Sequence, residues 1–331
     1  MFSSSKPNRQ TQVLRLIVGY GAIACAVPYL ALKVIWLTGG QLGVADATMM
    51  RDASMVALNV ATAGMDLVGI AIALAFTHAW GQRIPAWLVL PPTWVALGLL
   101  ARFVVAVPVT LIAGMLTVRS MPRPPGPVHP WVYALVYTEF VGMGIGLALA
   151  FVFYVRVRWG SVFQSTTRAA STGPTHRVQV PLANTAALMA AVVGGLHLAW
   201  ASGATVGLPS ELVARRTLSS HVINAVDGAT MAAAAVGVVM MVHRLGRQSS
   251  FWVPVALAWV GSGFLFAWGL WGLVNILGNT ALVRGRLGAT SWLNLLGLVQ
   301  LLAGLVIGVI TLWLLAERDA VHASHVLGHR K

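Results

Sequence analysis

The sequence predicts an all-α polytopic membrane protein whose eight transmembrane helices form two parallel four-helix repeats. Composition, apolar runs and an internal repeat support this prediction. The 331-residue chain is 58% hydrophobic and only 9% charged, with a mean hydropathy of +0.80. It therefore has more apolar surface than a soluble domain can cover with polar groups.

Each expected helix is an apolar run of about 20 residues or more, the length that crosses roughly 30 Å of hydrocarbon. The third run contains Pro91, Pro92 and Pro108, so we expect it to be tilted or kinked. The expected spans cover residues 14–37, 53–79, 86–116, 131–155, 180–203, 221–243, 252–278 and 292–315.

The two halves repeat their tryptophans and glycines at a nearly constant offset. Trp36 begins the segment W-L-T-G-G-Q-L-G-V, and Trp200, 164 residues later, begins W-A-S-G-A-T-V-G-L. Trp87 and Trp94 recur 165 residues later, again seven residues apart. Because four helices return the chain to its starting side, the second copy enters the membrane in the same orientation as the first.

Basic residues indicate the orientation in the membrane. With the N-terminus inside, thirteen of the 22 Lys and Arg residues fall on inside segments and helix ends, and seven fall outside. Such a bias is typical of cytoplasmic loops, so we expect a cell (plasma) membrane protein with both termini cytoplasmic. The expected organisation is 1–155 for the first repeat, 156–179 for a polar cytoplasmic linker, 180–315 for the second repeat and 316–331 for a cytoplasmic tail.

Ionisable side chains inside the apolar runs are the candidate functional residues. A charge at the centre of a spanning helix costs about 2.5 to 3.5 kcal/mol on insertion scales, so each one needs a partner or water. Counting about 1.5 Å per residue from the helix ends places opposite charges at matched depths. The expected pairs are Asp66 with Arg102, Lys33 with Glu139, and His197 with Asp227.

Two interpretations of these charges remain open. They could only fix which helix packs on which, or they could form a site at which Lys33 and His197, equivalent positions in the two halves, face each other. Asn59 and Asn224 are also equivalent, and they could line the same cavity or bond between helices. A neutral His has a pKa near 6.5, so a pair of His197 with Asp227 could sense external pH or pass a proton.

The glycine-rich segments after Trp36 and Trp200 also allow two interpretations. They could be plain helix ends, each with a tryptophan at the membrane interface. Alternatively, the outer loops 38–52 and 202–220 could fold back over an outward cavity.

Motifs of enzymes and cofactor sites are absent from the sequence. It contains no H-E-x-x-H, G-x-S-x-G or G-x-x-x-x-G-K motif, and its single cysteine offers no thiolate cluster. The basic residues lie at the ends of apolar runs, as topology signals do. We therefore expect no enzymatic activity, no cofactor, no metal and no nucleic-acid partner.

A family resemblance rests on the segment A-L-K-V-I-W-L-T-G-G around Lys33, the stretch from Pro85 to Leu100, and the bias toward Ala, Val, Gly and Arg. These features resemble a large group of poorly characterised actinobacterial polytopic membrane proteins. Some members of that group are similar to membrane partners of extracytoplasmic-function sigma factors. The resemblance covers most of the chain and assigns no site residues.

Two functions of different classes follow. The first is a small-solute or proton-linked permease with an outward-facing polar cavity between the repeats, lined by Lys33, Glu139, His197 and Asp227. The second is a membrane sensor or regulator, anti-sigma-like, that responds to an external compound and uses its linker or tail as a docking peptide. The expected partners are the lipid bilayer, a small-molecule ligand or proton, and a second copy of the chain or a cytoplasmic regulatory protein.

Overall fold

The computed structural model describes residues 9–116, 127–160, 174–246, 250–280 and 291–328. All of its long elements are helices, and eight of them are long and apolar enough to span a membrane. This confirms an all-helical protein with eight candidate spans. The chain divides into two compact units, unit 1 (Met1–Trp159) and unit 2 (Gly160–Lys331).

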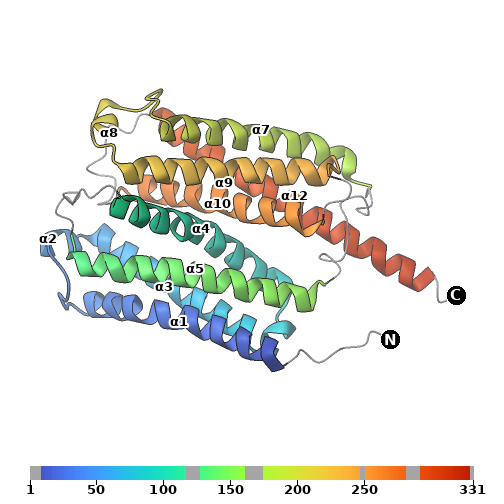
Figure 1. The fold of residues 1–331 in the computed structure, drawn as a ribbon, viewed down its shortest axis with the longest axis horizontal. Helices are drawn as coiled ribbons and strands as arrows, with labels where there is room; N and C mark the ends of the chain where they lie inside the picture. The colour runs from blue at the N-terminus through green and yellow to red at the C-terminus, as the bar shows by residue number, and fades with distance from the viewer. Residues whose placement is uncertain (1–8, 117–126, 161–173, 247–249, 281–290, 329–331) are drawn as a thin grey trace. The chain divides into compact units, whose positions relative to one another are not determined.

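Unit 1 is a bundle in which α1 packs on α3 and α5, and α5 also packs on α3 and α4 (Figure 1). Its core gathers around the fully buried side chains of Phe76, Leu147 and Tyr154. An isolated β-bridge joins Val44 to Val128 near the ends of the bundle. The elements are α1 (Arg9–Leu37), α2 (Ala47–Met50), α3 (Ala53–Thr77), the 3-10 helix η1 (Ala79–Arg83), α4 (Ala86–Leu116) and α5 (Pro130–Arg158).

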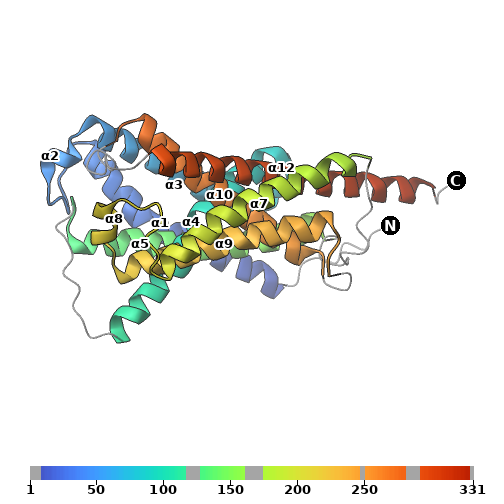
Figure 2. The ribbon, with the colours of Figure 1, turned by 90° about the horizontal axis from the view of Figure 1, so that it is seen from above.

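Unit 2 is a bundle in which α7 packs on α9, α9 on α10, α10 on α12, and α12 back on α7. The helices of each unit run side by side in both views (Figures 1 and 2). The elements are α7 (His176–Ala201), α8 (Ser210–Ala214), α9 (Leu218–Val242), α10 (Trp252–Leu277) and α12 (Ser291–Gly328).

Glycines let α7 and α9 approach closely. A Cβ atom on Gly228 of α9 would lie 2.7 Å from the carbonyl oxygen of Gly194 on α7 and 2.7 Å from the Leu198 side chain. Any larger residue would have to displace backbone there. The close approach brings the polar side chains of these two helices within reach of one another.

Several helices extend beyond their expected boundaries, and two of them change the expected organisation of the chain. Helix α7 begins at His176, so the end of the expected linker 156–179 is helical, while residues 161–173 lie outside the described part. Helix α12 continues to Gly328, so most of the expected tail 316–331 prolongs the last helix. The physical reason is local: residues 309–327 contain neither Gly nor Pro and include strong helix formers.

Candidate functional site

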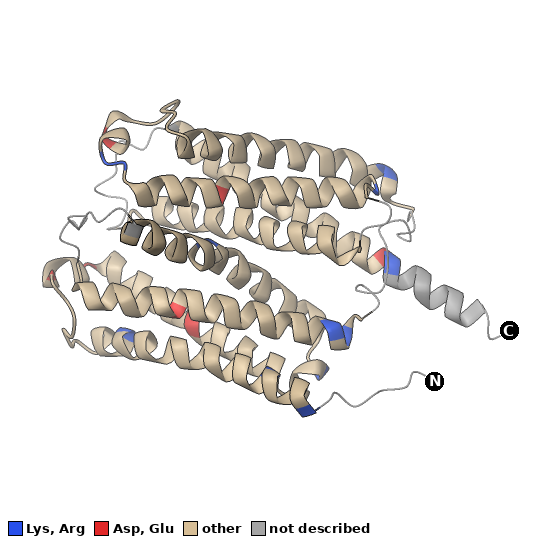
Figure 3. Cartoon of the chain, viewed as in Figure 1, with Lys and Arg blue, Asp and Glu red and all other residues tan. Residues whose placement is uncertain are grey.

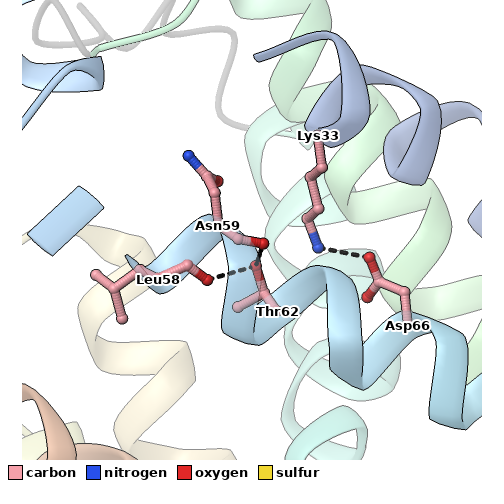
Figure 4. Close-up of polar contacts among 5 residues, drawn as sticks. All are labelled: Lys33, Leu58, Asn59, Thr62 and Asp66. Atoms are coloured by element: carbon pink, nitrogen blue, oxygen red, sulfur yellow. Dashed lines mark hydrogen bonds and ion pairs between the residues drawn. The ribbon is translucent and has the colours of Figure 1, made fainter. Parts of the chain in front are cut away.

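A buried cluster of charged side chains lies inside unit 1. Lys33 on α1 is 1% exposed, and its Nζ donates a 2.6 Å hydrogen bond to Oδ2 of Asp66 on α3 (Figure 4). The same ammonium lies 4.3 Å from the centre of the Tyr29 ring, one turn earlier on α1. Glu139 on α5 is 2% exposed, and its carboxyl lies close enough to Asp66 and Lys33 to interact electrostatically with both. Three helices thus bring together one ammonium and two carboxyls.

The direction of the helices explains how Lys33 reaches Asp66. Lys33 lies one turn before the end of α1 at Leu37, whereas Asp66 lies near the middle of α3. Side chains on a helix tilt toward its N-terminus. The four-carbon stem of Lys33 therefore points back along α1, from the helix end toward the middle of the bundle.

Two other polar residues of α3, Thr62 and Asn59, lie near Asp66 and do not bond to Lys33. Thr62, one turn earlier, donates its hydroxyl to the carbonyl oxygens of Leu58 at 2.9 Å and Asn59 at 3.3 Å. Asn59 is buried, and its side-chain amide turns away from the Lys33–Asp66 pair (Figure 4). Among these polar side chains of α3, Asp66 is therefore the one that bonds to Lys33.

Charge counting indicates the chemistry of this cluster. One ammonium balances one carboxylate, so two carboxyls beside it are electrically neutral only when the pair holds one proton. Burying a charge without compensation inside spanning helices is costly. Oε2 of Glu139 is buried and has no hydrogen-bond partner among the described residues. The arrangement can bind and release a proton between two carboxyls.

Most Lys and Arg residues of each unit lie near helix ends, whereas acidic residues occur both there and in mid-bundle (Figure 3). At the ends, basic side chains bond to backbone oxygens. Arg15 donates to the carbonyl of Phe76 at 2.7 Å, and Arg158 donates to the carbonyl of Ile84 at 2.7 Å. These two arginines bind backbone carbonyls at the ends of helices and are not part of the buried cluster.

The observed pairing in unit 1 differs from the expected one. Asp66, expected to pair with Arg102, forms its ion pair with Lys33. Lys33 and Glu139 do belong to one cluster, as expected, with Asp66 in contact with both. Arg102 lies on α4, which supplies neither the ammonium nor the carboxyls of this cluster.

A second polar cluster lies between α7 and α9 of unit 2. Nδ1 of His197 is 2.9 Å from Oδ1 of Asn224 and 3.9 Å from Oδ2 of Asp227. Asn224 donates its amide to the carbonyl of Ser220 at 2.8 Å, so its oxygen is the acceptor and the assigned proton lies on Nδ1 of His197. The His197 ring also meets the Trp200 ring edge-on, with centroids 4.9 Å apart. The structure therefore brings His197 and Asp227 together, as the sequence predicts.

Each cluster draws its contacts from its own unit. Lys33 binds Asp66 of unit 1, and His197 binds Asn224 of unit 2. The prediction that Lys33 and His197 face each other stays a prediction, because these hydrogen bonds each lie within one unit. Asn59 and Asn224 likewise differ, since only Asn224 bonds to the equivalent basic side chain.

The glycine-rich segments after α1 and α7 form the C-terminal turns of these helices. Each has a glycine with positive φ, 93° at Gly39 and 108° at Gly203, a conformation that glycine adopts without steric cost. The next residue then donates to a carbonyl five residues back, as in a Schellman motif. Both tryptophan indoles bond forward to the following loop, Trp36 to the carbonyl of Leu42 at 2.8 Å and Trp200 to that of Val206 at 2.9 Å.

Asp46, in the connection between α1 and α3, behaves differently from the buried acids. Its carboxylate accepts hydrogen bonds from the Thr48 hydroxyl and from the backbone N–H groups of Thr48 and Met49, capping α2. These bonds hold the pKa of the Asp46 carboxyl below its usual range. Asp46 therefore stays ionised at neutral pH and is no candidate for proton exchange.

Tyr29 is the member of the unit 1 cluster that the sequence analysis missed. It precedes Lys33 by four residues, a spacing that places two side chains on the same helix face. That spacing was the available signal, but a tyrosine in an apolar run is not conspicuous. Its ring lies 4.3 Å from the ammonium of Lys33, measured to the ring centre.

Comparison with protein-family models, with curated proteins and with solved structures finds no match to the chain. The resemblance to actinobacterial membrane proteins therefore stays a prediction. Function is inferred from the two clusters themselves.

Proposed function

We propose that this multi-pass membrane protein is a proton-linked permease for a small solute, located in the cell membrane with both termini cytoplasmic. The observation that carries the proposal is the buried contact of Lys33, Asp66 and Glu139, an ammonium beside two carboxyls. Ionisable groups inside spanning helices typically mark ion pathways and proton relays. In this proposal, Asp66 and Glu139 hold the coupling proton, and Lys33 keeps the protonated cluster neutral.

We also propose that the two units are parallel repeats. Several similarities support this. In each unit the first helix packs on the second and on the last, and the last packs on the third. The first helix of each ends in the same glycine turn and the same tryptophan-to-loop hydrogen bond. Parallel repeats are one of the plans on which transporters are built.

The test is solute-induced proton movement in liposomes that contain the purified full-length protein and a trapped pH-sensitive dye. Mixtures of neutral amino acids, of monosaccharides and of monovalent salts are added in turn. At least one mixture is expected to change the internal pH with the wild type. Glu139→Gln should abolish that change, because the amide cannot exchange a proton.

Glu211→Gln is the matched control, since Glu211 lies exposed on α8. It should retain the wild-type rate. The permease proposal fails if no mixture moves protons, or if Glu139→Gln moves them as fast as the wild type. A pH-dependent conformational change without any flux would instead favour the sensor.

A further inference from the structure

Helix α9 carries a ladder of polar side chains that faces α7. His221, Asn224 and Asp227 are three residues apart, a spacing that keeps them on one helix face. Nδ1 of His221 bonds to the carbonyl of Ala201, at the end of α7, at 2.8 Å. Asn224 and Asp227 then meet His197, one turn further back on α7. The ladder leads from the end of α7 about 9 Å into the bundle.

We infer that the imidazole–carboxylate pair of His197 and Asp227, at the inner end of this ladder, is a second proton-binding site. This site goes beyond the proposed function, which rests on unit 1. The unit 2 site consists of one imidazole and one carboxyl, whereas the unit 1 cluster consists of the Lys33 ammonium and the carboxyls of Asp66 and Glu139.

Burial makes the pair a proton site. Asp227 is 2% exposed, so an ionised carboxylate there needs a compensating positive charge. One proton shared by His197 and Asp227 makes the pair neutral, and loss of that proton leaves the pair with the negative charge of the carboxylate. The two groups therefore titrate as one coupled unit. The His197 side chain is 17% exposed, whereas that of Asp227 is 3% exposed.

Within the described part of unit 2, α9 and the loop before it carry titratable groups near His197. Helix α9 contributes His221 and Asp227, and α10, which packs on α9, has no ionisable side chain. Arg216 bonds to the carbonyls that follow α7. The described charges of α12, Glu317 and Arg318, lie at the opposite end of α7, where Glu317 bonds to Thr175 and Gln179.

Trp200 provides a built-in reporter of this site. Its ring touches the His197 ring, and an imidazolium quenches indole fluorescence more strongly than a neutral imidazole does. Trp36 is the matched control, because it holds the equivalent position in unit 1 and its ring neighbour is Tyr29, with centroids 6.0 Å apart. The phenol of a tyrosine does not titrate between pH 5 and 8, since its ordinary pKa is about 10.

The experiment is a pH titration of tryptophan fluorescence from pH 5 to 8, with the full-length protein in lipid nanodiscs. The difference between the wild type and Trp200→Phe isolates the Trp200 signal, and the difference from Trp36→Phe isolates that of Trp36. The Trp200 signal is expected to fall as His197 becomes protonated, while the Trp36 signal stays constant. His197→Gln should remove the transition.

Further variants assign the transition. His221→Gln should leave it in place, and Asp227→Asn should move its midpoint by about one pH unit or more, because it removes a charge about 4 Å from the imidazole. A Trp200 signal that is constant in the wild type, or an unmoved midpoint in Asp227→Asn, overturns the inference. So does a transition that persists in His197→Gln.

The measurement is independent of the permease proposal. Glu139→Gln is expected to stop solute-linked proton movement and to leave the Trp200 titration unchanged. The two proposals can therefore fail separately. If Glu139→Gln also removes the Trp200 transition, the site in unit 2 is not separate and the inference is wrong.

Discussion

At the scale of single residues, the buried Lys33 depends on its two acidic neighbours. An ammonium taken out of water loses several kcal/mol of hydration, which attraction to a carboxylate offsets only at close contact. The 2.6 Å bond to Asp66 supplies that contact, and the Tyr29 ring adds a favourable face. Removing Lys33 alone should therefore lower the stability of the protein more than replacing Lys33 and Asp66 together.

We expect Lys33→Met to lower the free energy of unfolding by about 3 to 5 kcal/mol, because it leaves buried carboxyls without their cation. The double variant Lys33→Met with Asp66→Asn should recover most of that loss. Denaturation of the purified protein in mixed micelles, followed by circular dichroism, measures both. If the double variant is no more stable than the single one, Lys33 and Asp66 are not energetically coupled.

The charged residues of both clusters and the pairing of His197 with Asp227 could be predicted from the sequence, but the pairing of Lys33 with Asp66 could not. Lys33, Asp66, Glu139, His197 and Asp227 are conspicuous because charges are rare in apolar runs. Depth can be counted along a helix, whereas the rotation of each helix about its axis cannot. Counting Cα positions also ignores the stem of Lys33, which carries its charge about 6 Å away from the backbone.

At the scale of secondary-structure elements, the contact of α7 with α9 holds the second cluster in register. Gly228 and Gly194 bring the two backbones together, and His197 meets Asn224 and Asp227 beside that crossing. The short distance between the two helix backbones is therefore as necessary for the contacts of His197 as the polar side chains themselves.

Gly228→Ala is expected to destabilise the protein by about 1 to 3 kcal/mol, because its Cβ would press on the backbone of α7. Gly195→Ala is the matched control on the facing helix, since a Cβ there meets nothing within 4 Å. It should be neutral or stabilising by up to about 1 kcal/mol, because Ala favours helix more than Gly does. Thermal unfolding of the two variants side by side is the measurement. Equal midpoints would show that the crossing tolerates a methyl group.

Helix existence was predictable, and helix ends were less so. The eight apolar runs match eight helices because hydrophobic length is a strong signal. The starts and ends depend on hydrogen bonds that composition does not reveal. The extension of α12 to Gly328 shows this, since no continuous apolar run marks its last turns.

At the scale of the whole molecule, orientation follows from the distribution of basic residues. The two ends of each bundle differ in charge, and cytoplasmic segments retain Lys and Arg. The connection after α1 is therefore expected outside the cell and η1 inside. Exposed residues in both segments make the expectation testable by chemical labelling.

In a Cys25→Ser background, Gln41→Cys should react with a membrane-impermeant maleimide in intact cells. Arg83→Cys, in η1, should react only after the cells are permeabilised. Both positions are exposed, so accessibility of the side chain does not limit either reaction. The reverse pattern would place the N-terminus outside.

Helix α4 of unit 1 bends more easily than a regular helix, because it contains three prolines. Pro91, Pro92 and Pro108 remove three of the backbone hydrogen bonds by which a spanning helix resists bending, and α4 is far less buried than α10. Its Phe103 ring packs on Phe140, with centroids 4.5 Å apart, directly beside Glu139 in the chain. Bending α4 therefore costs less energy than bending a helix with all its backbone hydrogen bonds, and this compliant helix packs one residue away from a buried carboxyl.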